Sequence, residues 1–276
     1  MDALPVPTVT PEWLVAHLTD GDLRILDTRW SLAAGSERGA YEAGHIPGSV
    51  FIDLDLELAG PPGRGGRHPL PEPAIFGAAM RRAGISTDSS VVVYDEVTGA
   101  AARAWWLLRT SGHELVSVLD GGLSAYLAIG GPLSTDPPKL GEGGFTASVF
   151  ASAVPATAVQ SRQEVGDLVL DARTSERYRG ERNPLDPRPG HLPGARSLPW
   201  MDLYRNGRLG TPHEIRGRLE ELGYREQPVI AYCGSGITAC ALLLALEAAG
   251  VGGLHLYPGS WSEWAGEPTY PVELGS

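Results

Sequence analysis

Short apolar runs alternate along the whole chain with longer stretches of mixed polarity. In the first half, four runs have the length and composition of buried strands: Ile25–Asp27, Val50–Ile52, Val91–Tyr94 and Leu115–Leu119. The second half contains four matching runs: Leu168–Leu170, Ala195–Leu198, Val229–Tyr232 and Leu254–Tyr257. Because strands that alternate with helices form parallel sheets with helices on both faces, the pattern predicts an α/β fold.

The ends of the intervening helices are marked by local sequence signals. A capping hydroxyl precedes a first-turn proline at two places, Thr10-Pro11 and Thr211-Pro212. Glycines stand where two helices are expected to end, at Gly84 and Gly223.

Sequence blocks recur in the same order in the two halves of the chain. The blocks Ile25–Arg29, Gly44–Ser49, Val91–Asp95 and Val118–Gly122 return as Val169–Arg173, Gly190–Ala195, Val229–Cys233 and Leu256–Ser260. Recurrence of this kind indicates duplication of one domain. We predict a first domain at 1–130, a Gly- and Pro-rich linker at 131–156 and a second domain at 157–276.

A cysteine directly follows one of the predicted strands. Cys233 is succeeded by Gly234, Ser235 and Gly236, and an apolar helix is expected from Ala239 to about residue 249. The amides of such a loop and the helix N-terminus can converge on an anion. The anion that the sequence places there is a thiolate, which is nucleophilic.

The matching position in the first repeat is Asp95. A carboxylate cannot perform thiol chemistry. We therefore predict that 1–130 is a non-catalytic copy and that 157–276 is the catalytic one.

The chain contains only two cysteines, Cys233 and Cys240. Their spacing fits neither a disulfide nor a metal-binding pattern, so Cys240 is expected to be a small core residue. No metal and no organic cofactor is implied. Sparse cysteine usage favours a reducing compartment.

The formal net charge of −11 argues against nucleic acid and anionic membranes as partners. The sequence has no apolar run long enough to span a bilayer and no signal-peptide pattern near Met1, so a cytoplasmic location is expected. Arg64 and Arg67, which lie among glycines, are expected in a flexible loop.

Together these motifs resemble the tandem-domain rhodanese family of thiosulfate and 3-mercaptopyruvate sulfurtransferases. The resemblance covers essentially the whole chain and rests on both Gly-His-(Ile/Leu)-Pro-Gly boxes, Asp171-Ala172-Arg173, Asp120-Gly121-Gly122 and the Cys233 loop. It implies two tandem rhodanese-like domains, the C-terminal one catalytic. It also implies a ping-pong reaction in which Cys233 takes a sulfur atom, becomes a persulfide and passes the sulfur to an acceptor such as cyanide, thioredoxin or glutathione.

The loop sequence separates two types within the family. Residues Cys233 to Thr238 are similar to the mercaptopyruvate type, which usually has valine where Ile237 stands here. The thiosulfate type typically carries a basic residue just after the cysteine, and a compact dianion gains from such a cation. We therefore expect 3-mercaptopyruvate as donor, with thiosulfate as the alternative, and Gly234, Gly236, Ile237 and Thr238 as the loop that receives it.

Arginines ahead of the second Gly-His box are candidates for binding a carboxylate, because a planar guanidinium can bind it bidentately. By resemblance, Arg177 and Arg188 match the substrate-binding arginines of the family. Their separation is longer than in some relatives, so Arg179 and Arg182 are alternatives for the second position.

The resemblance further implies a proton relay formed by Ser235, His68 and Asp55. In the alternative interpretation, Ser235 completes a turn and His68 is an ordinary loop histidine. His45 and His191 recur in both repeats, the inert one included, and are expected to be structural.

Two other functions are weighed against sulfur transfer. A cysteine phosphatase needs an arginine six residues after its nucleophile, where this chain has Ala239. A non-catalytic rhodanese-domain binding or regulatory protein is disfavoured by the retained Cys233.

Overall fold

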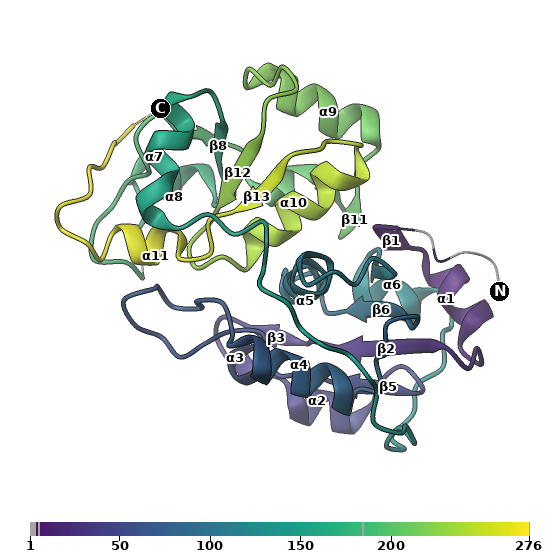
Figure 1. The fold of residues 1–276 in the computed structure, drawn as a ribbon. Helices are drawn as coiled ribbons and strands as arrows, with labels where there is room; N and C mark the ends of the chain where they lie inside the picture. Colours follow the sequence, from purple (N-terminus) through teal and green to yellow (C-terminus); the bar gives the residue numbers. More distant parts are fainter. Residues whose placement is uncertain (1–3, 5, 184, 276) are drawn as a thin grey trace. The chain divides into compact units, whose positions relative to one another are not determined.

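Two parallel β-sheets form the framework of the chain (Figure 1). The computed structural model describes residue 4, residues 6–183 and residues 185–275. The remaining six residues include the start of the first predicted domain and the end of the second, which therefore lie outside the described residues. The chain divides into two units. The first unit comprises Met1–Gly60, Pro71–Ala151 and Asn206–Arg208, and the second comprises Pro61–Leu70, Ser152–Arg205 and Leu209–Ser276.

The first unit is built on a five-stranded sheet with the order β1-β7-β6-β2-β5, in which every neighbouring pair is parallel. These strands are β1 (Thr8–Val9), β2 (Leu23–Asp27), β5 (Ser49–Phe51), β6 (Ser90–Tyr94) and β7 (Val116–Leu119). A short antiparallel pair consists of β3 (Trp30–Ser31) and β4 (Gly35–Ser36). The helices are α1 (Pro11–His17), α2 (Arg38–Ala43), α3 (Leu54–Glu57), α4 (Pro73–Arg82), α5 (Ala100–Thr110) and α6 (Gly122–Ala128).

The central strand β6 is buried at every position, as expected for a parallel strand covered on both faces. Val92 and Tyr94 of β6 pack in one cluster with Ile25 of β2, Leu14 of α1 and Leu123 of α6. Helix α5 packs against β6 and β7. The alternation of strands and helices predicted from the sequence is therefore the architecture of this unit.

The second unit has a four-stranded parallel sheet with the order β13-β12-β8-β9. Its strands are β8 (Leu168–Asp171), β9 (Arg196–Ser197), β12 (Val229–Tyr232) and β13 (Leu254–Leu256). The helices are α7 (Ala156–Glu164), α8 (Ser175–Arg179), η1 (Trp200–Leu203, a 3-10 helix), α9 (Pro212–Glu221), α10 (Thr238–Ala248) and α11 (Ser260–Trp264). A short hairpin is formed by β10 (Tyr204–Arg205) and β11 (Arg208–Leu209).

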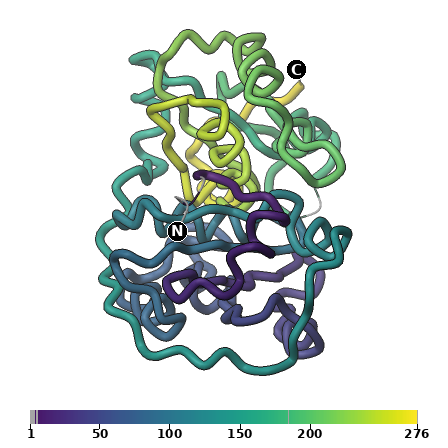
Figure 2. Tube along the Cα trace, turned by 90° about the vertical axis from the view of Figure 1, so that its right-hand side faces the viewer, coloured from purple at the N-terminus to yellow at the C-terminus, as the bar shows by residue number. Residues whose placement is uncertain are grey.

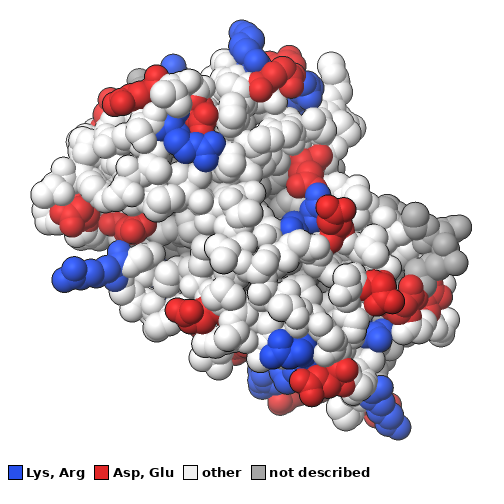
Figure 3. Space-filling view, in the orientation of Figure 1, with Lys and Arg blue, Asp and Glu red and all other residues white. Residues whose placement is uncertain are grey.

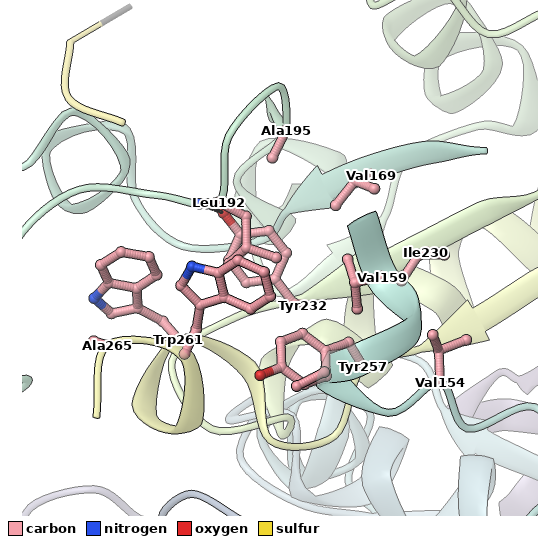
Figure 4. Close-up of a cluster of buried hydrophobic side chains, with 12 residues drawn as sticks. Val154, Val159, Val169, Leu192, Ala195, Ile230, Tyr232, Tyr257, Trp261 and Ala265 are labelled. Atoms are coloured by element: carbon pink, nitrogen blue, oxygen red, sulfur yellow. Dashed lines mark hydrogen bonds between the residues drawn. The ribbon is translucent and has the colours of Figure 1, made fainter. Parts of the chain in front are cut away.

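Aromatic side chains dominate one side of the second unit's core. Tyr232 of β12, Tyr257 and Trp261 lie together with apolar side chains of β8 and α7 (Figure 4). Trp261 and Trp264 are fully buried, so their large side chains anchor α11 and the segment after β13 to the sheet.

The local predictions of helix ends are confirmed. Thr10 caps α1 through the N–H of Trp13 at 3.2 Å. Thr211 forms a capping box with Glu214 at the start of α9. Gly84 and Gly223 follow the last residues of α4 and α9 with φ of +72° and +93°, a conformation that costs glycine little.

The two repeats share a buried ion pair as well as sequence. Arg29 Nε donates to Asp27 Oδ1 at 3.1 Å, and Arg173 Nε donates to Asp171 Oδ1 at 2.9 Å. In each repeat the arginine also donates to a main-chain carbonyl, that of Gly44 or Gly190. These residues connect the end of a central strand to the start of the Gly-His box, which explains why the motifs recur together.

The recurring histidines are structural, as predicted. His45 and His191 are 1% and 2% exposed. Each ring stacks on a tyrosine, Tyr41 or Tyr178, and donates from Nδ1 to the carbonyl oxygen of that same tyrosine.

Two segments belong to a unit to which the predicted boundaries did not assign them. Residues 131–151, within the predicted linker, belong to the first unit, where Gly143 and Phe145 donate main-chain bonds to Arg81 and Ile85. Figure 2 follows this segment in teal along the outside of that unit. Residues 61–70, from the first half of the sequence, belong to the second unit. Hydrogen-bonding partners decide both placements.

Basic and acidic side chains lie in small mixed groups on the face drawn in Figure 3, and this face carries no extended basic patch. Among the described residues, none of the helices combines the length and hydropathy needed to cross a bilayer.

Candidate active site

Cys233 lies at the carboxyl end of β12, between the neighbouring strands β8 and β13. Its side chain is 2% exposed, and its sulfur accepts the N–H of Gly236 at 3.1 Å. Helix α10 begins at Thr238, immediately behind the loop. The predicted order of strand, cysteine loop and helix is therefore present, with the sulfur held by a main-chain amide.

The loop depends on a glycine that no other residue can replace without strain. Gly236 has a φ of +81°, and a Cβ atom at this position would lie 2.4 Å from the carbonyl oxygen of Pro258. Ile237, 2% exposed, and Thr238 follow as the N-cap and first residue of α10. The Sγ of Cys240 donates to the Gly236 carbonyl at 3.3 Å, so the second cysteine packs beneath the loop.

A buried serine after β13 holds the main chain of the cysteine. The N–H of Cys233 donates to the hydroxyl of Ser260 at 3.1 Å, and this hydroxyl donates to the carbonyl of Tyr257 at 2.9 Å. Ser260 is fully buried and has a φ of +54°, a conformation that costs a non-glycine residue energy. The surrounding structure thus fixes the position of Cys233.

Two members of the predicted relay are in contact. Ser235 Oγ lies 2.8 Å from Nδ1 of His68, in a hydrogen bond. Ser235 is 8% exposed, and His68 belongs to the 61–70 segment of the second unit. The third member, Asp55, lies in α3 of the first unit and accepts a hydrogen bond from Trp30 Nε1 at 3.0 Å.

Arg177 meets the cysteine loop from α8. A Cβ atom built on Gly234 would lie 3.0 Å from Nη2 of Arg177, so the guanidinium lies directly against the loop. Burial lowers the pKa of Arg177, and the nearby charge of Arg173 lowers it further, while Asp186 and Cys233 act in the opposite sense. A guanidinium beside the thiol suits a donor that carries an anionic group.

A second guanidinium lies at the same glycine. A Cβ atom on Gly234 would lie 2.9 Å from Nη2 of Arg67. Arg67 and Arg177 both form ion pairs with Asp186, one with each carboxylate oxygen, and that side chain is 0% exposed. The main-chain N–H of Arg67 donates to Ser262 Oγ at 3.0 Å. Arg67 is thus held in place, in contrast to the flexible loop that its glycine neighbours suggest.

Arg188 makes extensive contacts with the main chain. Its guanidinium donates to four main-chain carbonyls at 2.7–3.0 Å, those of Trp264, Ala265, Glu267 and Tyr270. These bonds use four of its five N–H groups and hold the chain that follows α11. Binding of the substrate by Arg188 stays a prediction, since carbonyls at the end of α11 and after it use four of its donors.

The two alternative arginines have other surroundings, and a role in substrate binding stays a prediction for both. Arg179 forms an ion pair with Glu181 at 2.8 Å on the surface. Arg182 is exposed, and its main-chain N–H donates to Glu176.

Sequence reasoning did not assign Arg67, Asp186, Ser260 or Ser262 to the site. The available signal for Arg67 was its place directly before His68. In the sequence, Asp186 falls between Tyr178 and His191, whose rings stack on each other and which are 13 positions apart. The corresponding pair of the first repeat, Tyr41 and His45, is only four positions apart. The extra residues of the second repeat therefore form the loop that carries Asp186.

A model of the rhodanese-like domain matches residues 10–129 and 155–267. The chain belongs to the rhodanese family. This rhodanese-family chain is 42% identical over 278 residues to the "Probable 3-mercaptopyruvate sulfurtransferase" of Pseudomonas aeruginosa, with 97% of this chain and 98% of the relative covered. It is 33% identical over 277 residues to the thiosulfate sulfurtransferase of Mus musculus, covering 93% and 91% of the two chains.

A solved structure has a similar fold. The crystal structure of SseA from Escherichia coli, a 3-mercaptopyruvate sulfotransferase, matches 93% of this chain and 99% of its own with a TM-score of 0.81 and 38% identity. This rhodanese-family chain is accordingly an enzyme, a sulfurtransferase.

Proposed function

We propose that the enzyme transfers a sulfur atom from 3-mercaptopyruvate to a thiophilic acceptor through a persulfide on Cys233. The observation that carries this proposal is the contact of the Arg177 guanidinium with the loop that holds the Cys233 sulfur. A cation placed there can hold the carboxylate of the donor while its sulfur approaches the thiolate. The Pseudomonas aeruginosa relative is named as a probable 3-mercaptopyruvate sulfurtransferase, which supports 3-mercaptopyruvate as the donor.

In the first half-reaction, the thiolate of Cys233 attacks the sulfur of 3-mercaptopyruvate. An S–S bond forms, the C–S bond breaks, and its electron pair remains on the carbon as the enolate of pyruvate. The proton of the donor thiol moves to this carbon, which completes pyruvate. The hydrogen-bonded pair Ser235 and His68 is suited to carry that proton, because both groups can accept and donate. Asp55 as the third member stays a prediction.

In the second half-reaction, cyanide or a thiolate attacks the outer sulfur of the persulfide. The S–S bond breaks, its electron pair returns to Cys233, and the product is thiocyanate or a new persulfide. Both steps balance without a metal or an organic cofactor. The nature of the physiological acceptor, thioredoxin and glutathione included, and the cytoplasmic location stay predictions from the sequence.

The proposal is tested by mass spectrometry of the protein after treatment with 3-mercaptopyruvate without an acceptor. One added sulfur atom is expected on Cys233, and pyruvate is expected in equal amount. Cys233→Ser should carry no added sulfur and should have no turnover, whereas Cys240→Ala serves as the matched control that keeps both. An unmodified Cys233, or turnover that survives its replacement, would contradict the mechanism.

Thiosulfate is a second candidate donor, since two guanidinium groups lie against Gly234 and a relative bears the name thiosulfate sulfurtransferase. The two donors are compared by their kcat/KM with cyanide as acceptor. A larger value for 3-mercaptopyruvate is expected, and a larger value for thiosulfate would reverse the assignment of the donor.

A further inference from the structure

A cavity of about 240 Å³ lies in the first unit beside α2, β5 and α4 (Figure 1). Its lining comes from these elements and from the predicted linker, and it includes Arg38, Tyr41, Phe51, Arg82, Pro138 and Leu140. All six belong to the first unit, and none has a role in the proposed sulfur transfer. The volume is below the range of about 300–1,000 Å³ that is typical of drug-sized ligands, so the cavity suits a small molecule.

Two guanidinium groups face this cavity, and its described lining contains no carboxylate. Arg82 forms an ion pair with Glu57 at 2.6 Å. Arg38 forms no ion pair with any described residue, and its guanidinium carbon lies 4.7 Å from the centroid of the Phe51 ring. Burial raises the pKa of Tyr41, whereas the nearby charges of Arg38 and Arg82 act in the opposite sense. One positive charge therefore stays uncompensated at this cavity, in a chain whose net charge is −11.

The second repeat has no arginine at the position that corresponds to Arg38. Tyr41 and Tyr178 correspond to each other, because each stacks on the histidine of its own Gly-His box. Three positions earlier, the first repeat has Arg38 and the second has Ser175. The helix that carries the tyrosine therefore forms with or without a cation at this position.

The same comparison applies to Arg82. Gly84 and Gly223 follow the ends of the corresponding helices α4 and α9. Two positions earlier, the first repeat has Arg82 and the second has Glu221, which carries the opposite charge. The shared architecture accepts either charge here, so it does not explain why two arginines meet at one cavity of the first repeat.

The lining defines the chemistry of a ligand. A guanidinium donates hydrogen bonds and accepts none, and the Tyr41 hydroxyl already donates to the carbonyl of Ser49 at 2.8 Å. The ligand must therefore supply acceptors. A single carboxylate matches the one uncompensated charge, and a planar guanidinium can bind it bidentately. The aromatic rings and the exposed Leu140 offer apolar surface to a flat group.

We propose that this cavity of the first unit binds a small organic monoanion, whose carboxylate contacts Arg38 and Arg82 and whose flat apolar group packs against Tyr41 and Leu140. Both arginines are exposed, so the carboxylate reaches them from solvent. The proposal goes beyond sulfur transfer and gives the first repeat a binding role of its own.

The first test measures the dissociation constant of 4-fluorobenzoate for the full chain by fluorine NMR. Arg38→Ser introduces the residue that the second repeat has at this position, so the fold should be kept. Loss of one charged contact at an exposed site should weaken binding by on the order of tenfold. An equal dissociation constant in the wild type and Arg38→Ser would overturn the proposal.

Arg196→Ser is the matched control. Arg196 is exposed and pairs with Leu170 in the second sheet, as the cavity residue Val50 pairs with Leu26 in the first. This variant should bind 4-fluorobenzoate as tightly as the wild type. A weakening equal to that of Arg38→Ser would show that the probe responds only to the net charge of the chain, which contradicts a defined site.

A series of probes tests the ligand class on the wild type, without any substitution. The neutral 4-fluorobenzamide and the ring-free fluoroacetate should each bind at least about tenfold more weakly than 4-fluorobenzoate. Equal binding of the amide would exclude recognition of a carboxylate. Equal binding of fluoroacetate would exclude the packing of a flat group.

The cysteine loop also presents guanidinium groups, so the site of binding must be identified. Arg177→Gln and Cys233→Ser should bind 4-fluorobenzoate as the wild type does, because neither residue lines the cavity. If Arg177→Gln abolishes binding and Arg38→Ser does not, the probe binds at the cysteine loop and the proposal is wrong. Failure of the proposed function is seen separately, as the absence of added sulfur on Cys233.

Discussion

Asp95 and Cys233 occupy the same position in the two repeats, directly after β6 and β12. The carboxylate of Asp95 accepts the main-chain N–H groups of Val97, Gly99 and Ala101 at 2.6, 3.1 and 3.0 Å. The sulfur of Cys233 accepts that of Gly236 at 3.1 Å. The first loop therefore presents several main-chain N–H groups, and the second presents one, to a potentially anionic atom.

The two loops hold different chemical groups, a carboxylate in the first repeat and a sulfur in the second. Burial raises the pKa of Asp95, and the N–H groups of its loop oppose that effect. In the first repeat the carboxylate accepts hydrogen bonds from its own loop. In the second repeat the same construction holds the sulfur that we propose as the nucleophile.

The contact between Ser235 and His68 predicts a defect in one half-reaction only. Ser235→Ala or His68→Gln should slow the formation of the persulfide from 3-mercaptopyruvate by roughly 100-fold or more, since a proton must leave the donor thiol in this step. Discharge of the persulfide by cyanide needs no such proton and should stay within about threefold of the wild-type rate. Rapid-mixing measurements of pyruvate release and thiocyanate formation separate the steps, and equal slowing of both would exclude a relay.

Replacement of the loop glycine predicts a loss of stability together with activity. Gly236→Ala places a Cβ atom 2.4 Å from a carbonyl oxygen in a residue with a φ of +81°. We expect the free energy of unfolding to fall by about 2–4 kcal/mol and the turnover to be lost. Gly252→Ala is the matched control, because a Cβ atom there meets nothing within 4 Å. A Gly236→Ala enzyme with normal stability and turnover would show that the loop conformation is not required.

Replacement of Arg188 should mainly lower stability, whereas replacement of Arg177 should mainly raise KM. Arg188→Ala removes hydrogen bonds to four carbonyls and should lower the free energy of unfolding by about 2–4 kcal/mol, with KM for 3-mercaptopyruvate within about twofold. Arg177→Ala should raise KM by roughly 10- to 100-fold with a smaller effect on stability. Urea unfolding and steady-state kinetics on both variants decide the matter. A raised KM in Arg188→Ala at normal stability would restore it to the substrate site.

Buried His113 predicts a pH dependence of stability. Its ring is 4% exposed, and burial lowers its pKa below the ordinary value of 6.5. As the pH falls through about 6.5, the unfolded chain binds a proton here that the folded chain does not, so stability is lost on acidification. The free energy of unfolding of His113→Asn should therefore fall less steeply between pH 7 and pH 5 than that of the wild type. Parallel curves would show that His113 does not contribute.

The position of Cys233 and the fold could be predicted from the sequence because their signals are local. Cys233 stands between an apolar strand and a glycine loop, so its place at the end of a central strand follows from neighbours in the chain. The capping residues Thr10 and Thr211 act within one helical turn, and their predictions are confirmed. The Gly-His boxes recur in both repeats, and this recurrence identified their histidines as structural.

The arginines could not be assigned in the same way, because a guanidinium at the end of a long side chain reaches partners that the sequence does not specify. Arg188 stands in a matching motif, yet its donors are used by carbonyls 76 to 82 positions away. Arg67 and Asp186 are 119 positions apart and form an ion pair. Neither the contacts of Arg188 nor the ion pair of Arg67 with Asp186 follows from a periodicity or a spacing in the sequence.

By itself, the sequence determined the two repeats, their parallel α/β architecture and the single cysteine with the surroundings of a nucleophile, since each depends on apolar periodicity or on residues a few positions apart. Only the tertiary structure decided which charged side chains surround that cysteine. Their placement depends on long-range packing, which brings a glycine turn from the first half of the chain and an extra loop from the second half to one buried carboxylate.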